Sequence, residues 1–294
     1  MAFCPKKLLS PGGDHPVFVP AESETLSAIV DPQNNKICGA VVLRYLKFES
    51  EIFARRMGFL CVFLKEANPP ITEKLDSIFL AIISNARDHG YEHLAIKARV
   101  EHIPIIMAAE NCGFRTVSAT TTYLYIKNIT KPPKWKYLFK IRTAVPTDKS
   151  ALMRIASESF SHTRYYNDPF FSKDKCGMLY RKWVENCFDK DWSSNVLVAT
   201  NSNKDPVGFI TYKVDPELEN ATGVRRGGTG LSACLPHAKG AYLALMAHLM
   251  NDVPAKEIPF GEYTTQLENI EVIRAWQHFG LEPGKNEIAL HLTL

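Results

Sequence analysis

Two stretches, one in each half of the chain, repeat the same order of a short helix with one apolar face, a glycine and a strand. His102 precedes Gly113 by eleven positions, and Asn269 precedes Gly280 by the same interval. The shared apolar faces predict two copies of one fold, although helix–glycine–strand order is common enough to recur by chance. The apolar positions that coincide are Ile103 with Ile270, Ile105 with Val272, Ile106 with Ile273, and Phe114 with Leu281.

A proline pair near the middle of the chain marks the expected domain boundary. Pro132 and Pro133 stand between two lysines, and this run can continue neither a helix nor a strand. A chain of 294 residues is long enough for two domains of ordinary size. We therefore predict domains over 1–130 and 137–294, joined by a linker over 131–136. Helical and strand periodicities occur in both, which predicts an α/β (α+β) fold class.

The composition is that of a globular protein and excludes several classes. Hydrophobic residues make up 46% of the chain and charged residues 22%, so each half can bury a core. The net charge of +4 is spread along the chain and gives no strong signal for nucleic acid. No signal-peptide core and no apolar run long enough to span a membrane are present. Seven cysteines, an odd number without a C-x-x-C pair, indicate reduced thiols and a cytoplasmic protein.

The two copies differ where a phosphate would bind. The second copy has Gly240 at the head of its long helix, over about 238–251. The first has Pro69 and Pro70 before its long helix, over about 72–89. Proline lacks an N–H group, so this entry offers fewer donors to an anion. If one copy binds a cofactor, we expect it to be the second.

The stretch around Gly240 resembles the acyl-CoA pyrophosphate turn of the GNAT family of N-acetyltransferases. The family pattern is Arg/Gln-x-x-Gly-x-Gly/Ala, and His237 stands here in place of Arg or Gln. The resemblance implies tandem GNAT-like domains with mixed, mostly antiparallel sheets flanked by helices, the first domain degenerate. It also implies acetyl-CoA as the cofactor and a strand amide within 232–235 as the donor to the thioester oxygen. The implied cofactor-binding residues around the turn are Cys234, Leu235, His237, Ala238, Lys239, Gly240, Ala241 and Tyr242.

A second GNAT-like motif follows in the last part of the chain. Thr265 and Asn269 match Thr-x-x-x-Asn before a helix, and Gly280 with Leu281 matches the Gly-Phe after it. The resemblance places the Asn269 side chain near the pantetheine arm of the cofactor. The alternative is that Asn269 simply caps the helix, and the two roles are compatible.

The segment over 161–171 indicates the acceptor. Together with the stretches 179–186 and 48–53, it resembles bacterial TDP-amino-sugar (TDP-fucosamine-type) acetyltransferases, which pair a reduced N-terminal domain with a complete second one. Aromatic rings can stack on a base or sugar, and arginine can hold a diphosphate. The alternatives are a surface ion pair between Arg164 and Asp168, and aromatics that merely cover the domain junction. The expected substrate-binding residues are Arg164, Tyr165, Tyr166 and Asp168.

The catalytic residues are harder to assign. His162 is a candidate base because a histidine can titrate near neutral pH. The family's thiolate acid is a tyrosine in the last helix, where this chain has Trp276, and an indole N–H is no proton donor of that kind. Tyr242 or Tyr263 are candidates for that role, with core packing as the alternative for either. Metal sites are not expected: His89 and His93 are four apart, but Gly90 ends the helix between them.

Three functions remain open at this point. The first is transfer of acetyl from acetyl-CoA to the amine of a nucleotide-linked amino sugar or another small amine. The second is a non-catalytic GNAT-like protein that binds acyl-CoA or sugar nucleotide. The third is an amino-acid or protein N-terminal acetyltransferase. The sequence leaves the acceptor and the formation of a homodimer open.

Overall fold

The strands and helices follow the hydrophobic periodicity of the sequence, and the computed structural model divides them between two compact units. One unit, here called the C-terminal unit, comprises residues 121–166 and 172–285. The other, the N-terminal unit, takes the described residues before 121 together with 167–171 and 286–294. The residues that the structure describes are 7–8, 17–18, 24–30, 37–64, 74–127, 129–130, 139–161, 163–189, 195–215, 219–220, 223–251 and 258–294.

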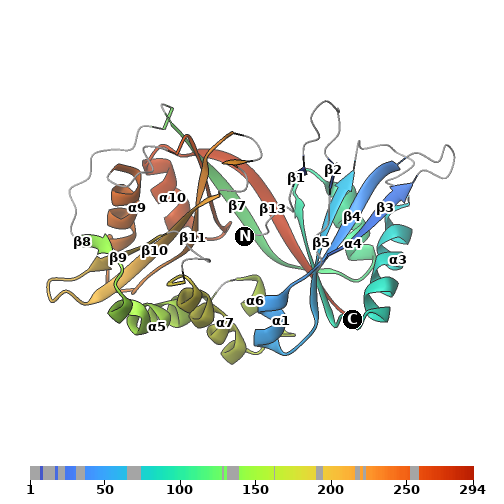
Figure 1. Cartoon of the computed structure of the whole chain (residues 1–294), viewed down its shortest axis with the longest axis horizontal. Helices are drawn as coiled ribbons and strands as arrows, with labels where there is room; N and C mark the ends of the chain where they lie inside the picture. Colours follow the sequence, from blue (N-terminus) through green and yellow to red (C-terminus); the bar gives the residue numbers. More distant parts are fainter. Residues whose placement is uncertain are drawn as a thin grey trace. The chain divides into compact units, whose positions relative to one another are not determined.

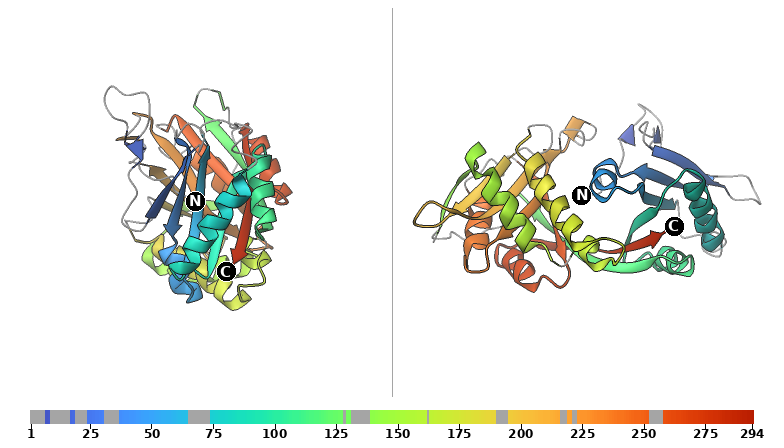
Figure 2. Two further views of the ribbon diagram at one scale, coloured as in Figure 1. Left: turned by 90° about the vertical axis from the view of Figure 1, so that its right-hand side faces the viewer. Right: turned by 90° about the horizontal axis from the view of Figure 1, so that it is seen from below.

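The N-terminal unit is a sheet with α3 (Leu75–Asp88) and α4 (Ile103–Asn111) packed on one face (Figures 1 and 2). β3, β4 and β5 pair antiparallel, β5 pairs parallel with β6, and β6 pairs antiparallel with β13. Phe79 and Ile83 of α3 share one hydrophobic core with Leu94 and Ile96 of β6 and with residues of α4. The elements are β3 (Glu24–Val30), β4 (Ile37–Tyr45), α1 (Lys47–Phe53), β5 (Met57–Leu64), α3 (Leu75–Asp88), β6 (His93–Arg99) and α4 (Ile103–Asn111), with a separate pair, β1 (Lys7–Leu8) and β2 (Val17–Phe18).

The C-terminal unit is a sheet buried on both faces. β8, β9, β10 and β11 pair antiparallel in that order, and β11 pairs parallel with β12. α9 and α10 pack on one face, where Leu197 and Ile210 are buried; Val198 and Phe209, which alternate with them, are buried as well. The elements are β8 (Lys140–Thr143), η1 (Pro146–Asp148), α5 (Lys149–Ser159), α6 (Arg164–Asn167), α7 (Lys173–Asn186), β9 (Asn195–Thr200), β10 (Pro206–Asp215), β11 (Arg226–Cys234), α9 (Ala241–Asn251), β12 (Phe260–Gln266) and α10 (Ile270–His278).

The predicted repeat is confirmed in the local structure. His102 and Asn269 are the N-cap residues of α4 and α10, and Gly113 and Gly280 follow these helices with positive φ angles of 92° and 74°. The longer order also recurs, because β5–α3–β6–α4–β7 matches β11–α9–β12–α10–β13, each with a parallel pair at its start. The predicted mixed, mostly antiparallel sheets flanked by helices are therefore present in both halves.

Two long strands are divided between the units, which the sequence prediction did not include. β7 (Arg115–Ile126) begins in the N-terminal unit and ends in the C-terminal unit, whereas β13 (Glu282–Thr293) runs from the C-terminal unit into the N-terminal one. The compact units therefore differ from the predicted domains 1–130 and 137–294, while the predicted linker 131–136 lies outside the described residues. Strand pairing explains the difference, since β13 forms a seven-residue ladder with β6.

No helix in the described part of the chain is both long and apolar enough to cross a lipid bilayer.

Candidate functional site

The turn between β11 and α9 consists of two successive hydrogen-bonded turns. The amide of Ala238 donates to the carbonyl of Leu235 over 2.9 Å, and the amide of Ala241 donates to the carbonyl of Ala238 over 3.0 Å. Gly240 has a φ of +89°, which a residue with a Cβ rarely adopts, so the second turn depends on this glycine. Ala238 is buried beneath the turn, while His237 and Lys239 are exposed on it.

Several backbone donors of this turn have no backbone acceptor among the described residues. Among the described residues, none accepts from the amides of Lys239, Gly240, Tyr242 or Leu243, whereas the amide of Ala244 already donates to the carbonyl of Gly240. Such donors gather at the positive end of a helix dipole, and this arrangement suits an anion. The turn can therefore hold a phosphate group, with the Lys239 ammonium adding positive charge beside it.

The strands β11 and β12 pair only at their beginnings. The parallel ladder joins residues 226–228 to residues 260–262, although β11 continues to Cys234 and β12 to Gln266. Leu231 donates its amide to the Thr211 hydroxyl, at a bulge against β10, and Leu235 donates to the carbonyl of Val207. Residues two apart on a strand point their amides the same way.

It follows that the amides of Ser232 and Cys234 point away from β10. They face the edge of β11 that is no longer paired with β12. These two are the strand amides available to a bound carbonyl oxygen. The amide of Leu235, one of the four expected candidates, already donates to the carbonyl of Val207. Burial raises the pKa of the Cys234 thiol to about 12, so the Cys234 side chain stays protonated at neutral pH.

Thr265 and Asn269 form one small hydrogen-bonded group at the start of α10. The Asn269 amide nitrogen donates to the Thr265 hydroxyl over 3.1 Å, and the Asn269 side-chain oxygen accepts from the amide of Val272 over 3.4 Å. The expected capping role of Asn269 is therefore confirmed. Its role toward a cofactor stays a prediction.

Comparison with curated proteins gives two distant relatives, and no family model matches the chain. The chain is 23% identical over 156 residues to the spore coat polysaccharide biosynthesis protein SpsD of Bacillus subtilis, covering 52% of the chain and 50% of that protein. It is 27% identical over 137 residues to dTDP-fucosamine acetyltransferase of Escherichia coli, covering 47% of the chain and 56% of that protein. The chain thus spans about half the length of the curated relatives it matches.

Solved structures match a much larger share of the chain. A GCN5-related N-acetyltransferase from Sphaerobacter thermophilus superposes with a TM-score of 0.62 at 14% identity, over 91% of this chain and 80% of that one. A tandem GNAT protein from the clavulanic acid biosynthesis pathway superposes with a TM-score of 0.52 at 10% identity, over 93% of this chain and 84% of that one.

The chain has the GNAT fold.

Within this GNAT fold, the two tyrosines considered as acids lie in the hydrophobic core of the C-terminal unit. Tyr242 accepts a hydrogen bond from the indole nitrogen of Trp276 over 2.8 Å, and Tyr263 packs edge-on against the same indole. Burial raises the pKa of both phenols well above the ordinary tyrosine value. A phenol with a raised pKa gives up its proton less readily, so the geometry favours packing, the alternative considered for both residues.

The segment expected to bind the acceptor is divided between the two units of the GNAT fold. Arg164, Tyr165 and Tyr166 belong to the C-terminal unit, while Asp168 belongs to the N-terminal unit. Arg164 donates to the Tyr165 hydroxyl over 2.6 Å, and the Tyr166 ring stacks near the Tyr180 ring. His162, the candidate base, lies outside the described residues.

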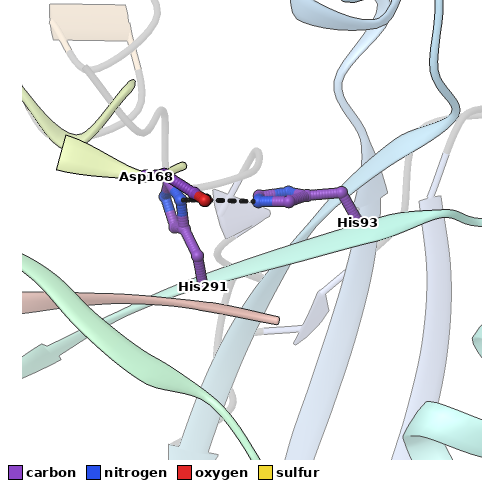
Figure 3. A group of neighbouring side chains, drawn as sticks. All are labelled: His93, Asp168 and His291. Carbon is purple, nitrogen blue, oxygen red and sulfur yellow. Dashed lines mark hydrogen bonds and ion pairs between the residues drawn. The ribbon is translucent and has the colours of Figure 1, made fainter. Parts of the chain in front are cut away.

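Asp168 lies in a buried cluster with two histidines that the sequence analysis did not bring together (Figure 3). Its Oδ2 atom lies 2.7 Å from His291 Nδ1 and 3.1 Å from His93 Nε2. Burial would raise the pKa of Asp168, but the hydrogen bonds to His291 and His93 outweigh burial and hold this pKa well below its usual value. The Asp168 carboxylate is turned to partners inside the N-terminal unit, and a role for Asp168 toward a substrate stays a prediction.

Proposed function

We propose that this protein is an acetyl-CoA-dependent N-acetyltransferase whose cofactor binds in the C-terminal unit. The observation that carries the proposal is the turn from Leu235 to Ala241, with its unused backbone donors and its left-handed Gly240. The diphosphate of coenzyme A would accept hydrogen bonds from the amides of Lys239, Gly240, Tyr242 and Leu243. The GNAT fold supports this assignment. The turn lies between β11 and α9, and β11 separates from its parallel neighbour β12 before it reaches the turn.

The separated strands would receive the thioester end of the cofactor. A carbonyl oxygen beside the amides of Ser232 or Cys234 would be stabilised as negative charge develops on it during attack by the amine. The free amine attacks the carbonyl carbon, the C–S bond breaks, and the proton that the amine nitrogen loses passes to solvent, from which the departing thiolate can take one up. A thiolate with a pKa near the ordinary value of about 8.5 departs without full protonation, so the absence of a nearby acidic phenol is compatible with turnover.

For the acceptor we propose the amino group of a nucleotide-linked sugar. The similarity to dTDP-fucosamine acetyltransferase over 137 residues supports this class, as does the group of Arg164, Tyr165 and Tyr166 on α6. A guanidinium can hold a diphosphate with paired hydrogen bonds, and Tyr166 is the more exposed of the two rings. Other small amines and amino-acid or protein N-termini are the competing acceptors.

A second candidate is a GNAT-like protein that binds acyl-CoA without turnover. The observation that favours it is the buried pair of Trp276 and Tyr242, which occupies the region where GNAT enzymes place their acid. This candidate and the first share the cofactor site and differ in whether product forms.

The deciding experiment measures release of coenzyme A by the whole chain with a panel of amines. The panel contains a TDP-amino sugar, the free amino sugar, an amino acid and a peptide N-terminus. We expect turnover with the nucleotide-linked sugar that exceeds the free sugar and that is lost in Gly240→Val. Binding of acetyl-CoA without turnover on any amine would contradict the enzyme proposal and support the non-catalytic candidate. Absence of acetyl-CoA binding would contradict both proposals.

A further inference from the structure

Three side chains in the N-terminal unit, two imidazoles and one carboxylate, converge on one point beneath the surface. We propose that His93, Asp168 and His291 bind a zinc ion. The three ligand atoms lie within 4.8 Å of one another, and the residues are 0%, 7% and 4% exposed. Imidazole nitrogen and carboxylate oxygen are donors that zinc takes in proteins. The site is separate from the proposed acetyl-CoA site and does not depend on it.

The sheet brings the two histidines together. In the antiparallel ladder of β6 and β13, His93 pairs with Thr293 and Ala95 pairs with His291. The histidines are therefore diagonal neighbours, two positions apart, and project from the same face of the sheet. Their rings lie nearly perpendicular, with centroids 4.7 Å apart, so that one nitrogen of each faces the same carboxylate oxygen (Figure 3).

The third ligand comes from a segment that is fixed to the same unit. The Asn167 side chain donates to the carbonyl of Val117 over 2.8 Å, and the Phe171 ring packs on Phe53 with centroids 4.2 Å apart. The Oδ1 atom of Asp168 accepts from the amide of Phe170 over 3.0 Å. This bond orients the carboxylate and leaves Oδ2 as the single ligand oxygen, which is the kind of outer contact that holds metal ligands in place.

The Asp168 carboxylate is buried, and a positive charge beside it would offset the cost of burying its negative charge. In the described part of the chain no lysine or arginine pairs with Asp168, whose ion-pair partners there are the two histidines. The Nδ1 atom of His93 is buried, and none of the described residues gives it a hydrogen-bond partner. A metal ion supplies the charge and leaves both rings neutral. A protonated His291 is the rival explanation.

Two of the three separations between ligand atoms are close to those of a loaded site, and all three lie within 4.8 Å. Tetrahedral zinc with bonds of about 2.0–2.1 Å places neighbouring ligand atoms about 3.3 Å apart. His93 Nε2 and Asp168 Oδ2 are 3.1 Å apart, and His291 Nδ1 and Asp168 Oδ2 are 2.7 Å apart. Small rotations of side chains would open these separations. The rings of Phe170 and Phe171 cover His93, so the ion would be enclosed and would fasten residues 167–171 to the sheet.

The test is metal content and binding in the whole protein. After exposure to zinc and dialysis, we expect elemental analysis to find zinc in a one-to-one ratio with protein. Cobalt(II) should give the visible absorption of a low-symmetry site, and zinc should raise the melting temperature of chelator-treated protein. His93→Gln is the informative variant, because glutamine keeps an N–H donor toward Asp168 but is a poor ligand. We expect it to weaken zinc binding by about a hundredfold or more.

His102→Gln is the matched control, since His102 is an exposed histidine of the same unit, and we expect it to bind zinc as the wild type does. If the wild-type protein holds no zinc after this treatment and gives no cobalt absorption, the proposal is overturned. A protonated His291 would then be the explanation for the charge beside Asp168. Equal zinc binding by His93→Gln would overturn it as well. If His93→Gln does not fold, the wild-type metal content and cobalt spectrum still decide.

Discussion

The indole nitrogen of Trp276 in α10 donates a hydrogen bond to the phenol oxygen of Tyr242 in α9, over 2.8 Å. The bond joins the two helices that cover one face of the C-terminal unit, and Trp276 is only 2% exposed. It therefore gives α10 a structural contact with α9.

We therefore expect Tyr242→Phe to affect stability more than catalysis. The substitution leaves the indole N–H buried without an acceptor, which should cost about 1–3 kcal/mol in the free energy of unfolding. Urea denaturation and kcat measured on the same preparation test this. A loss of kcat of about tenfold or more with unchanged stability would instead make Tyr242 the acid of the reaction.

Gly240→Val should weaken acetyl-CoA binding by about tenfold or more, which corresponds to about 1.4 kcal/mol. A branched side chain at φ +89° strains the turn and stands where a phosphate must approach the backbone amides. Calorimetry on the folded variant measures the loss. Gly223→Val is the control, because Gly223 also has a positive φ, of 69°, with open space around it. If Gly240→Val binds acetyl-CoA as tightly as Gly223→Val does, the turn is not the phosphate site.

Asn269 offers a way to separate helix capping from cofactor contact. Asn269→Asp keeps the oxygen that accepts from Val272, so we expect stability near that of the wild type, while Asn269→Ala should cost about 1 kcal/mol. If the Asn269 amide group also donates to the pantetheine arm, both variants should raise the Kd for acetyl-CoA. A wild-type Kd in the aspartate variant would leave Asn269 with capping alone.

The acid sensitivity of the C-terminal unit should depend on Asp148. Arg142 donates to both oxygens of this carboxylate, over 2.6 and 2.8 Å, and the Asp148 side chain is 6% exposed. These bonds hold the pKa of Asp148 below its ordinary value, although burial opposes them. The folded-state pKa lies below the unfolded one, so the stabilisation is complete above about pH 4 and is lost as the pH falls further.

Asp148→Asn should accordingly cost about 2–3 kcal/mol at pH 7, and the difference from the wild type should shrink below about pH 4. Urea midpoints at several pH values measure it. Glu219→Gln removes an exposed pair with Arg225 in the same unit and should cost less than about 1 kcal/mol. A difference for Asp148→Asn that stays constant down to pH 2 would contradict this account.

Local signals in the sequence predicted much of the fold. The short helix of the first repeat begins after His102 and ends before Gly113, as the repeat predicts, and Gly90 follows α3 with the positive φ expected after a helix. α1 was missed because its N-cap, Leu46, has no capping side chain and the helix has only seven residues. The division of β7 and β13 between units was missed because strand pairing between distant segments leaves no local periodicity.

The candidate sites show the same contrast. The turn at Gly240 and the cap at Asn269 each lie within a few consecutive residues, so a motif can point to them. His93, Asp168 and His291 are far apart in the sequence, and only the pairing of β6 with β13 brings the histidines to one face. His93 was considered only with His89, which caps α3 and shares no helix with it.

Hydrogen exchange of the whole chain with and without acetyl-CoA tests the central claim most directly. The whole chain is needed because β7 and β13 contribute residues to both units. Acetyl-CoA should slow exchange at the amides of Lys239, Gly240, Tyr242 and Leu243, for which the described residues offer no backbone acceptor, and leave the start of α3 unchanged. Gly240→Val should abolish the effect. Slowed exchange at α3 instead, or no change at the turn under saturating acetyl-CoA, would contradict the assignment of the cofactor to the C-terminal unit.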